Sequence, residues 1–358
     1  DSDFIETNKS ITYTLYIWLR YVEDPTINLA SLLGTSVKAY VSVNGTDTKE
    51  STSCKFDSSK KISYVVTFMK EDNKTVLETR KVSSGSVLGN LPSTRQYFTK
   101  TGGNGTEYTS TSTITDDALV YPKLTKFELD SWTTIATNVR NGNTGDYNVG
   151  DTKEVNLGTT YGTHTLRIAN TTTPSECSTS GFSQTACGFV LEFADIITTY
   201  EMNDTDTNVG GWPASSMYDF VNYDIYNSLP SDLKSTIIDT TVVSSHGSTN
   251  GENFTSIDKL YLLSLKEVYS DWSTNSYSSY DSAKDLTRTL DYYINKNVTS
   301  SDDSETIKKY KTTDSWWWLR EAHSNYDHSF FIVPTDDYSY FSTYANTSGG
   351  VSPAFRIG

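Results

Sequence analysis

The chain has 358 residues, a formal net charge of -15 and aromatic side chains at 13% of its positions. This length predicts two or three domains, and the aromatic content excludes a disordered chain. An acidic chain without a basic tract is a poor partner for nucleic acid or an anionic membrane, because both need clustered lysine and arginine. No apolar run reaches membrane-spanning length. We therefore expect neither nucleic-acid binding nor membrane insertion.

Residues 1–60 contain two strand-like runs, 11–19 and 36–43, in which β-branched or aromatic residues alternate with others. Two long strands alone do not make a stable domain. We therefore expect this segment to dock on the next domain of the chain or to be the tail of a truncated β-sandwich. The run at 13–19 resembles the end of the fibre-forming surface β-sandwiches of Gram-positive bacteria.

Residues 61–122 have a compact β pattern, with strands expected at 62–68, 75–79 and 114–121 and a turn at 71–74. This order resembles the Listeria–Bacteroides repeat, a small β-grasp module of surface proteins. That repeat normally carries Gly-Tyr-x-Phe and a Trp, where this chain has Gln96-Tyr97-Phe98 and no Trp. The resemblance implies a spacer that lifts the next domain off the cell wall.

Residues 123–358 are expected to form one larger domain. Strands are predicted at 152–157, 163–168 and 259–264, and helices at 215–227, 231–238 and 281–296. The domain has 16 basic and 30 acidic residues, and so carries -14 of the net charge. Helices and strands in this arrangement predict an α+β fold for the chain.

Two of the three cysteines, Cys177 and Cys187, bracket a loop rich in serine and threonine. They could close a small disulfide, or they could be two unrelated small residues. The sequence leaves both alternatives open.

The window 321–348 has the most unusual composition in the chain. It follows the apolar anchor 316–320 and precedes an expected closing strand at 350–357. Of its 28 residues, 22 are Tyr, Ser, Asn, Asp, His, Phe or Thr. Such residues dominate antibody paratopes, because tyrosine offers a large amphipathic contact at low entropy cost and small polar residues adapt their hydrogen bonds. The alternative is a polar loop over the core, but seven aromatic residues favour a binding surface.

Several motifs of the larger domain resemble a domain of unknown function that is common in surface proteins of gut Firmicutes and is related to the C-type-lectin fold. They are Gly145-Asp146-Tyr147, Val149-Gly150-Asp151, Asn208-x-Gly210-Gly211-Trp212, Leu229-Pro230, Asp258-Lys259-Leu260, Trp317-Trp318-Leu319-Arg320 and Gly350-Val351-x-Pro353-Ala354-Phe355. The two C-terminal motifs, at 317–320 and 350–355, are similar to the framework of variable proteins that are diversified by retroelements. In those proteins, Asn codons of the variable region are rewritten. The products of that rewriting exclude Lys, Glu, Gln, Met and Trp, and residues 322–348 contain none of these. The resemblance implies a C-type-lectin-like domain with a diversified surface.

Within such a frame, Phe330, Val333 and Ala345 are expected to be scaffold. Arg320 and Arg356 are expected to form buried hydrogen bonds or ion pairs rather than to bind ligand. The positions expected to display ligand contacts are Tyr326, Asp327, His328, Phe331, Ile332, Pro334, Asp336, Tyr338, Phe341, Tyr344 and Asn346.

No catalytic, metal or cofactor set is evident. The related formylglycine-generating oxidases use a cysteine pair near the end of the fold, and no cysteine follows Cys187 here. His323, His328, Asp327 and Asp336 could form a metal site but match no known ligand spacing. The run 204–215 departs from a calcium loop at its glycine and its twelfth position. The chain is therefore expected not to be an enzyme and to need no cofactor.

The leading hypothesis is an extracellular protein of a bacterial cell surface, with an adhesin-like or receptor-like role. A β-rich stalk at 1–122 would present the larger domain, and 321–348 would bind a protein or glycan on another cell or a phage. The alternative is a structural fibre or matrix subunit that assembles through its N-terminal strands by β-augmentation.

Overall fold

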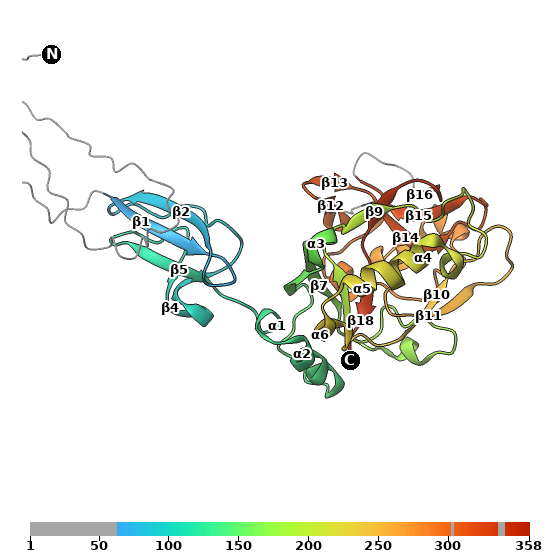
Figure 1. Cartoon of the computed structure of the whole chain (residues 1–358), viewed down its shortest axis with the longest axis horizontal. Helices are drawn as coiled ribbons and strands as arrows, with labels where there is room; N and C mark the ends of the chain where they lie inside the picture. Colours follow the sequence, from blue (N-terminus) through green and yellow to red (C-terminus); the bar gives the residue numbers. More distant parts are fainter. Residues whose placement is uncertain (1–62, 302–303, 336–340) are drawn as a thin grey trace, which may run out of the picture. The chain divides into compact units, whose positions relative to one another are not determined.

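The structure is a computed structural model that describes residues 63–301, 304–335 and 341–358. The segment 1–60, with its two expected strands, lies outside the described residues. Two separate hydrophobic clusters occur: one contains residues between Val66 and Val120, and the other contains residues between Phe127 and Ile357. Figure 1 labels many of the elements that contain these residues.

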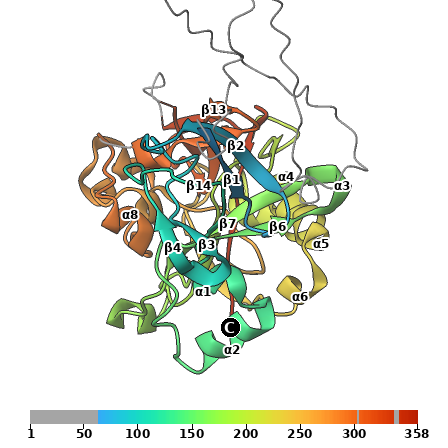
Figure 2. The same ribbon diagram turned by 90° about the vertical axis from the view of Figure 1, so that its left-hand side faces the viewer.

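The first cluster is built on a five-stranded sheet. The strands Ser63–Met69 and Ala118–Pro122 are parallel neighbours, and the other neighbouring strands are antiparallel. Phe68 packs edge-on against Tyr97 at 5.0 Å between ring centroids. Asn73, at φ 55°, lies in the turn expected at 71–74. Figure 2 labels four of the five strands of this sheet. In sheet order the strands are β2 (Val76–Ser83), β1 (Ser63–Met69), β5 (Ala118–Pro122), β3 (Tyr97–Lys100) and β4 (Asn104–Tyr108).

The second cluster lies among two larger sheets and two hairpins. The first sheet has the order β16 (Ser342–Tyr344), β15 (Ser329–Val333), β14 (Trp317–Ala322), β17 (Gly349–Val351) and β9 (Thr198–Tyr200), with β14 and β17 parallel. The second sheet has the order β18 (Ala354–Arg356), β8 (Val190–Phe193), β7 (Thr163–Asn170) and β6 (Thr152–Asn156). The hairpins pair β10 (Thr240–Ser244) with β11 (Phe254–Asp258), and β12 (Lys308–Tyr310) with β13 (Thr313–Ser315).

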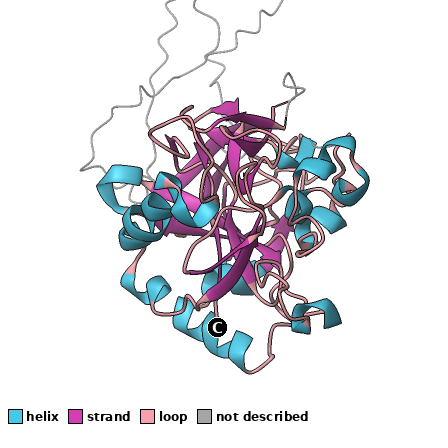
Figure 3. Ribbon diagram, turned by 90° about the vertical axis from the view of Figure 1, so that its right-hand side faces the viewer, coloured by secondary structure: helices cyan, strands magenta, loops and turns pink. Residues whose placement is uncertain are grey.

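Short helices surround these strands, as Figure 3 shows by colour. The expected helix at 215–227 occurs as one helical stretch: α4 (Ser216–Asp219), a π-helical segment (Phe220–Ile225) and α5 (Tyr226–Ser228). Where described, the helices are too short and too polar to cross a membrane. The others are α1 (Lys126–Leu129), α2 (Trp132–Arg140), α3 (Gly158–Tyr161), α6 (Ser231–Lys234), α7 (Leu265–Val268), α8 (Asp291–Asn295), and single turns at Thr101–Gly103, Ser175–Ser178, Trp212–Ala214, Trp272–Thr274, Ser276–Tyr280 and Ser304–Thr306.

Several predicted elements are wrong in extent or type; the helix expected at 231–238, for example, is only α6. The helix expected at 281–296 is present only as α8, because Leu290 before it is extended (φ -66°, ψ 145°). The segment 259–264 is buried as expected but is not a ladder strand. Its Tyr261 forms a single bridge to Ala354, while the N–H groups of Lys259 and Leu260 donate to the side chain of Asn222.

The α+β class predicted from the sequence is confirmed, with small mixed sheets and scattered helices. The expected single closing strand at 350–357 is in fact two strands, β17 and β18, which belong to different sheets. Pro353 separates them because it has no N–H to continue a ladder. One continuous segment therefore joins the two sheets of the larger domain.

The predicted apolar anchor is confirmed in β14. Trp317 and Trp318 are fully buried. A Cβ on Gly349 would lie 2.1 Å from the ring of Trp316 and 2.7 Å from Nε1 of Trp318. The tryptophan cluster thus requires glycine on the neighbouring strand, which positions β17 closely against β14.

Candidate functional site

A row of stacked rings lies beside the end of β14 and reaches the surface. We call Tyr280, His323, Tyr326, His328 and Tyr344 the aromatic row. Successive ring centroids are 4.7, 4.6, 5.6 and 5.0 Å apart, and the ring planes differ by 29° or less. Tyr326 is 49% exposed and Tyr344 is 56% exposed, whereas His323 is buried. The row is therefore anchored in the core and open at its outer end.

Asn208 fixes the backbone that carries the middle of the row, residues 323–329, which we call the 323–329 loop. Its side-chain Nδ2 lies within hydrogen-bonding distance of three carbonyl oxygens, those of Tyr326 (2.7 Å), Ser329 (2.9 Å) and His323 (3.2 Å). Its backbone N–H donates to the carbonyl of Asp327 at 2.8 Å. Asn208 is fully buried. The side chain and backbone of this one residue thus supply hydrogen-bond donors to buried carbonyls along the loop.

The motif that begins at Asn208 has a local structural reason for its glycines. Gly210 and Gly211 adopt φ of +82° and +59°, a region that favours glycine. The turn leads into Trp212, which is buried and whose Nε1 donates to Asp258 at 2.8 Å. The resulting fixed turn holds Asn208 against the 323–329 loop.

His323 is the inner support of the row. Its Nδ1 accepts hydrogen bonds from the backbone N–H groups of Asn325 (3.2 Å) and Tyr326 (3.3 Å). Burial, together with the nearby charge of His328, lowers the pKa of His323 to about 4. Phe331 stacks on the same ring at 5.2 Å. His323 is thus neutral at physiological pH. Its ring packs against its neighbours, and its Nδ1 stabilises the turn that follows it.

Polar groups accompany the exposed rings. Nδ1 of His328 donates to the carboxylate of Asp327 at 2.9 Å, because a carboxylate can only accept. This leaves Nε2 as the other hydrogen-bonding atom of His328. Asp327 and Asn346 are exposed. The outer end of the row therefore combines two tyrosines with a carboxylate and an imidazole.

A buried polar network lies under the row. Arg320 forms two hydrogen bonds with the carboxylate of Glu267 (2.6 and 2.7 Å), and both residues are fully buried. This ion pair confirms the structural role predicted for Arg320. Arg356, for which the same role was predicted, forms no ion pair within the described residues, where its Nε lacks a hydrogen-bond partner.

Glu321 and Asp281 belong to this network. The N–H of Ser245 donates to Glu321 at 2.5 Å, and the hydroxyl of Ser245 donates to Asp281 at 2.6 Å. Burial raises the pKa of Glu321 to about 8, and neighbouring Asp281 adds to the rise. Burial also raises the pKa of Asp281. Burial therefore favours the protonated form of Glu321, two residues before His323.

The structure brings together four of the eleven predicted contact residues: Tyr326, Asp327, His328 and Tyr344. Asn346 is exposed two residues after Tyr344. Among the scaffold predictions, Phe330, Val333 and Ala345 are buried, as expected. Asp336 and Tyr338 lie outside the described residues.

Three predicted display residues are not displayed. Phe331 and Ile332 are 1% exposed, and Pro334 is also buried. Phe331 and Ile332 belong to β15, which lies between β14 and β16 and is buried on both faces, and Pro334 follows this strand directly. Phe331, for example, packs against Trp272 at 5.9 Å. The display assigned to these three residues is wrong.

Phe341 is intermediate. It is half-buried and contacts a second aromatic group, with ring centroids 5.8 Å from Tyr269, 5.5 Å from Trp272 and 5.9 Å from Tyr277. Its ring therefore contributes mainly to packing under the surface.

Sequence reasoning missed two members of the site. Tyr280 gave no signal, because it lies 43 positions before its stacking partner His323 (323 minus 280). Asn208 stood in a quoted motif, but its partners in the 323–329 loop are too distant in sequence to be inferred from that motif. The metal alternative for His323 and His328 finds no support in the described part of the chain, where no three candidate ligands are grouped for a metal ion.

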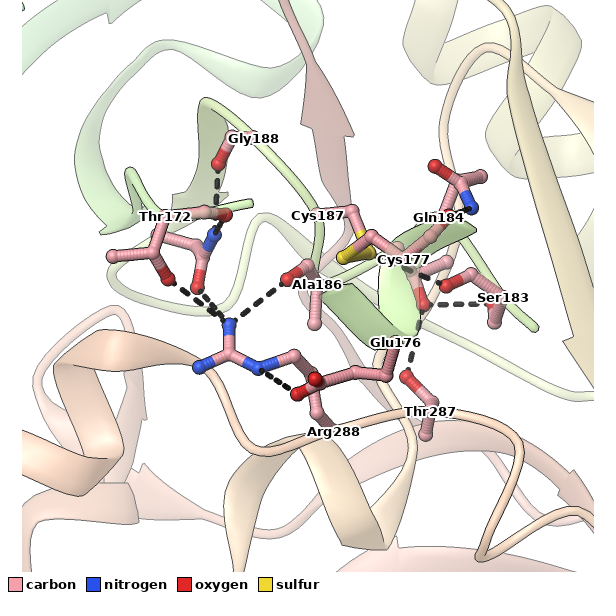
Figure 4. The surroundings of a disulfide bond; sticks show 12 residues. Thr172, Glu176, Cys177, Ser183, Gln184, Ala186, Cys187, Gly188, Thr287 and Arg288 are labelled. Carbon is pink, nitrogen blue, oxygen red and sulfur yellow. Dashed lines mark hydrogen bonds and ion pairs between the residues drawn. A yellow bond between two sulfur atoms is a disulfide. The ribbon is translucent and has the colours of Figure 1, made fainter. Parts of the chain in front are cut away.

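The cysteines Cys177 and Cys187 form a disulfide, which decides the alternative left open by the sequence. Figure 4 shows the bonded loop and the neighbouring Arg288. The guanidinium of Arg288 donates to the carbonyl of Ala186 at 3.1 Å and forms an ion pair with Glu176 at 3.6 Å. The loop is thus held by the disulfide and by the ion pair between Arg288 and Glu176.

Comparison with known proteins gives one match. Residues 189–358 are similar to a family described as Domain of unknown function (DUF6273). The matched segment includes Asn208, the network around Arg320 and every ring of the aromatic row. Neither the curated proteins nor the solved structures contain a match to the chain.

Proposed function

We propose that the chain is a ligand-binding protein that acts outside the cell and recognises its ligand with the outer end of the aromatic row. The observation that carries this proposal is the exposure of Tyr326 and Tyr344 on a stack that is rooted in the core. Large exposed aromatic groups with nearby polar atoms are typical of recognition surfaces.

The rigidity of the support favours binding over a solvated loop. Asn208 holds the loop backbone, and the stacked neighbours restrict the rings, so little side-chain entropy remains to be lost on association. Burial of the tyrosines would supply affinity, while Asp327 and His328 would supply specificity through hydrogen bonds. The ligand class that we propose is a protein or a glycan on another cell or a phage.

We further propose that the larger domain has a C-type-lectin-like fold of the retroelement-diversified type and that 61–122 is a β-grasp spacer. The composition of 322–348 and the closing motifs support the first part. If the surface is diversified, sister copies should differ at Tyr326, Asp327, His328, Tyr344 and Asn346. A template copy of these codons beside a reverse-transcriptase gene would test this. Differences concentrated instead in buried β15 would contradict it.

The Cys177–Cys187 disulfide supports an extracellular, bacterial cell-surface location, since structural disulfides persist in oxidising compartments. No described contact favours the fibre alternative, whose strands lie outside the described residues.

The test is a binding screen of the purified chain on a glycan array, intact bacterial cells and phage particles. Replacing Tyr326 and Tyr344 together by alanine should weaken any binding found by at least about tenfold. Tyr223→Ala is the matched control, because Tyr223 is 70% exposed but lies outside the row. Binding that is unaffected by the double substitution would contradict the proposal.

A further inference from the structure

A second candidate site lies at the other edge of the sheet that carries the row. The row includes Tyr344 on edge strand β16, whereas β9 forms the opposite edge. Beside β9 is a pocket of about 350 Å³ whose lining includes Tyr161, His164, Ile196, Ile197, Tyr310 and Lys311. The pocket shares no residue with the row.

The pocket has fixed walls and an apolar floor. Ile196 and Ile197 are 1% and 5% exposed. The N–H of Ile196 donates to the carbonyl of Lys309 at 3.0 Å, and Ile196 bridges to Tyr310, so the β12–β13 hairpin is attached to the floor. On the other side, Nε2 of His164 lies 2.9 Å from the carbonyl of Tyr161.

The charge of the lining is opposite to that of the domain around it. The lining contains Lys311 and His164 but no Asp or Glu, although residues 123–358 contain 30 acidic and 16 basic residues. Lys311 is exposed, and its ammonium lies 5.1 Å from the centre of the Tyr310 ring. It has no ion-pair partner within the described residues, whereas Lys309 on the same hairpin lies 3.9 Å from Asp314.

Lys311 also has an unfavourable backbone. It occupies the two-residue turn between the paired residues Tyr310 and Thr313 and has φ +60°, where glycine is the favoured residue. Strained positions of this kind are often retained at functional sites. Lys311 therefore carries a conformational cost at the rim of the pocket.

We propose that this pocket binds a small ligand that has both a carboxylate and a ring with an apolar face, namely an acidic sugar residue such as a uronate. The carboxylate would lie against the ammonium of Lys311, and the ring would pack on Tyr161 or Tyr310 over the isoleucine floor. This inference does not depend on the function proposed for the aromatic row.

The experiment is calorimetric titration of the whole chain with methyl β-D-glucuronide, methyl β-D-glucoside and acetate. We expect millimolar binding of the glucuronide, at least about tenfold weaker binding of the other two, and weakening as salt rises. Lys311→Gly should abolish binding and raise Tm, because it removes the charge and relieves the turn. Lys311→Gln should abolish binding without that gain.

Lys309→Gln is the matched control, since it removes the same charge from the same hairpin outside the pocket lining. It should leave the glucuronide affinity unchanged. Three results would each overturn the proposal: no binding of the glucuronide, an equal loss in Lys309→Gln, or acetate binding as tight as that of the glucuronide.

Discussion

At the scale of single residues, Asn208 fixes the backbone of the 323–329 loop although it is itself fully buried. Its side chain and backbone hold four carbonyl groups of the 323–329 loop. The side chains on the outside of the loop make no comparable contribution to its conformation. Exchange of Tyr326 or Asp327 should therefore alter binding far more than folding.

Replacing Asn208 by alanine should lower the free energy of unfolding by about 3 kcal/mol, because the carbonyls of Tyr326 and His323 lose the side-chain donor and the Ser329 carbonyl keeps only the N–H of His323. Urea denaturation measures this change. Asn325→Ala is the control, since Asn325 is exposed and its side chain should contribute little. Equal stability of the two variants would show that the loop does not depend on Asn208.

Glu321 should make the protein less stable as pH rises. Its pKa is about 8 in the folded state against an ordinary value of 4.5, so the folded state binds more protons between these values. The stabilising contribution is complete below pH 4.5 and is lost as pH rises through 8. Glu321→Gln should remove this dependence, and so gain on the order of 4 kcal/mol over wild type between pH 5 and pH 9.

The measurement is the free energy of unfolding at several pH values for wild type, Glu321→Gln and Glu154→Gln. Glu154 is an exposed carboxylate on β6 and should leave the wild-type profile unchanged. His323, with its lowered pKa, acts in the opposite sense and destabilises the fold as pH falls below 6.5. A Glu321→Gln profile parallel to wild type would contradict the role of Glu321.

At the scale of elements, close approach of strands decides which residues are tolerated. Gly350 on β17 is paired with Trp317 on β14. A Cβ added to Gly350 would lie 2.6 Å from Ile196 and 2.7 Å from the backbone oxygen of Trp316. Neither contact is tolerable, and a backbone oxygen in a sheet cannot move aside easily.

Gly350→Ala should therefore destabilise the larger domain by about 2 kcal/mol through overpacking. Gly251→Ala is the control, because a Cβ there meets nothing within 4 Å. Thermal unfolding of both variants would show whether Gly350 is needed for strand contact. A Tm of Gly350→Ala equal to that of wild type would mean that β14 and β17 can separate without cost.

The same elements show what the sequence could and could not predict. The burial of β14, the ion pair of Arg320 and several strand positions followed from local patterns of apolar and polar residues. The burial of Phe331 and Ile332 did not, because a strand covered on both faces has no alternation to reveal it. The stacking of Tyr280 on His323 depends on contacts between distant segments, which one sequence does not encode locally.

At the scale of the molecule, the larger domain combines an acidic surface with buried charges that are closely paired. Glu192, for instance, accepts hydrogen bonds from Arg167 at 2.8 Å, Lys308 at 2.8 Å and Tyr293 at 2.9 Å. Such fully bonded networks make the interior rigid. A rigid interior suits a protein whose two proposed sites lie at opposite edges of one sheet.

The disulfide should contribute to the stability of this domain. Replacing Cys177 and Cys187 together by serine should lower the free energy of unfolding by about 3 kcal/mol, as expected for a loop of this length. Adding dithiothreitol to wild type should give a similar loss, and should not affect the double variant. Equal free energies of unfolding for the oxidised and reduced protein would show that the disulfide does not stabilise the domain.

The strand switch at Pro353 has a consequence for how the chain reaches its native state. Because β17 and β18 complete separate sheets, neither sheet is whole until residues 349–356 have arrived. Until then, the preceding part of the larger domain has unpaired sheet edges, and folding to the native state is delayed. These unpaired edges can associate with other chains during the delay. Such a delay would keep the nascent polypeptide loosely organised during synthesis.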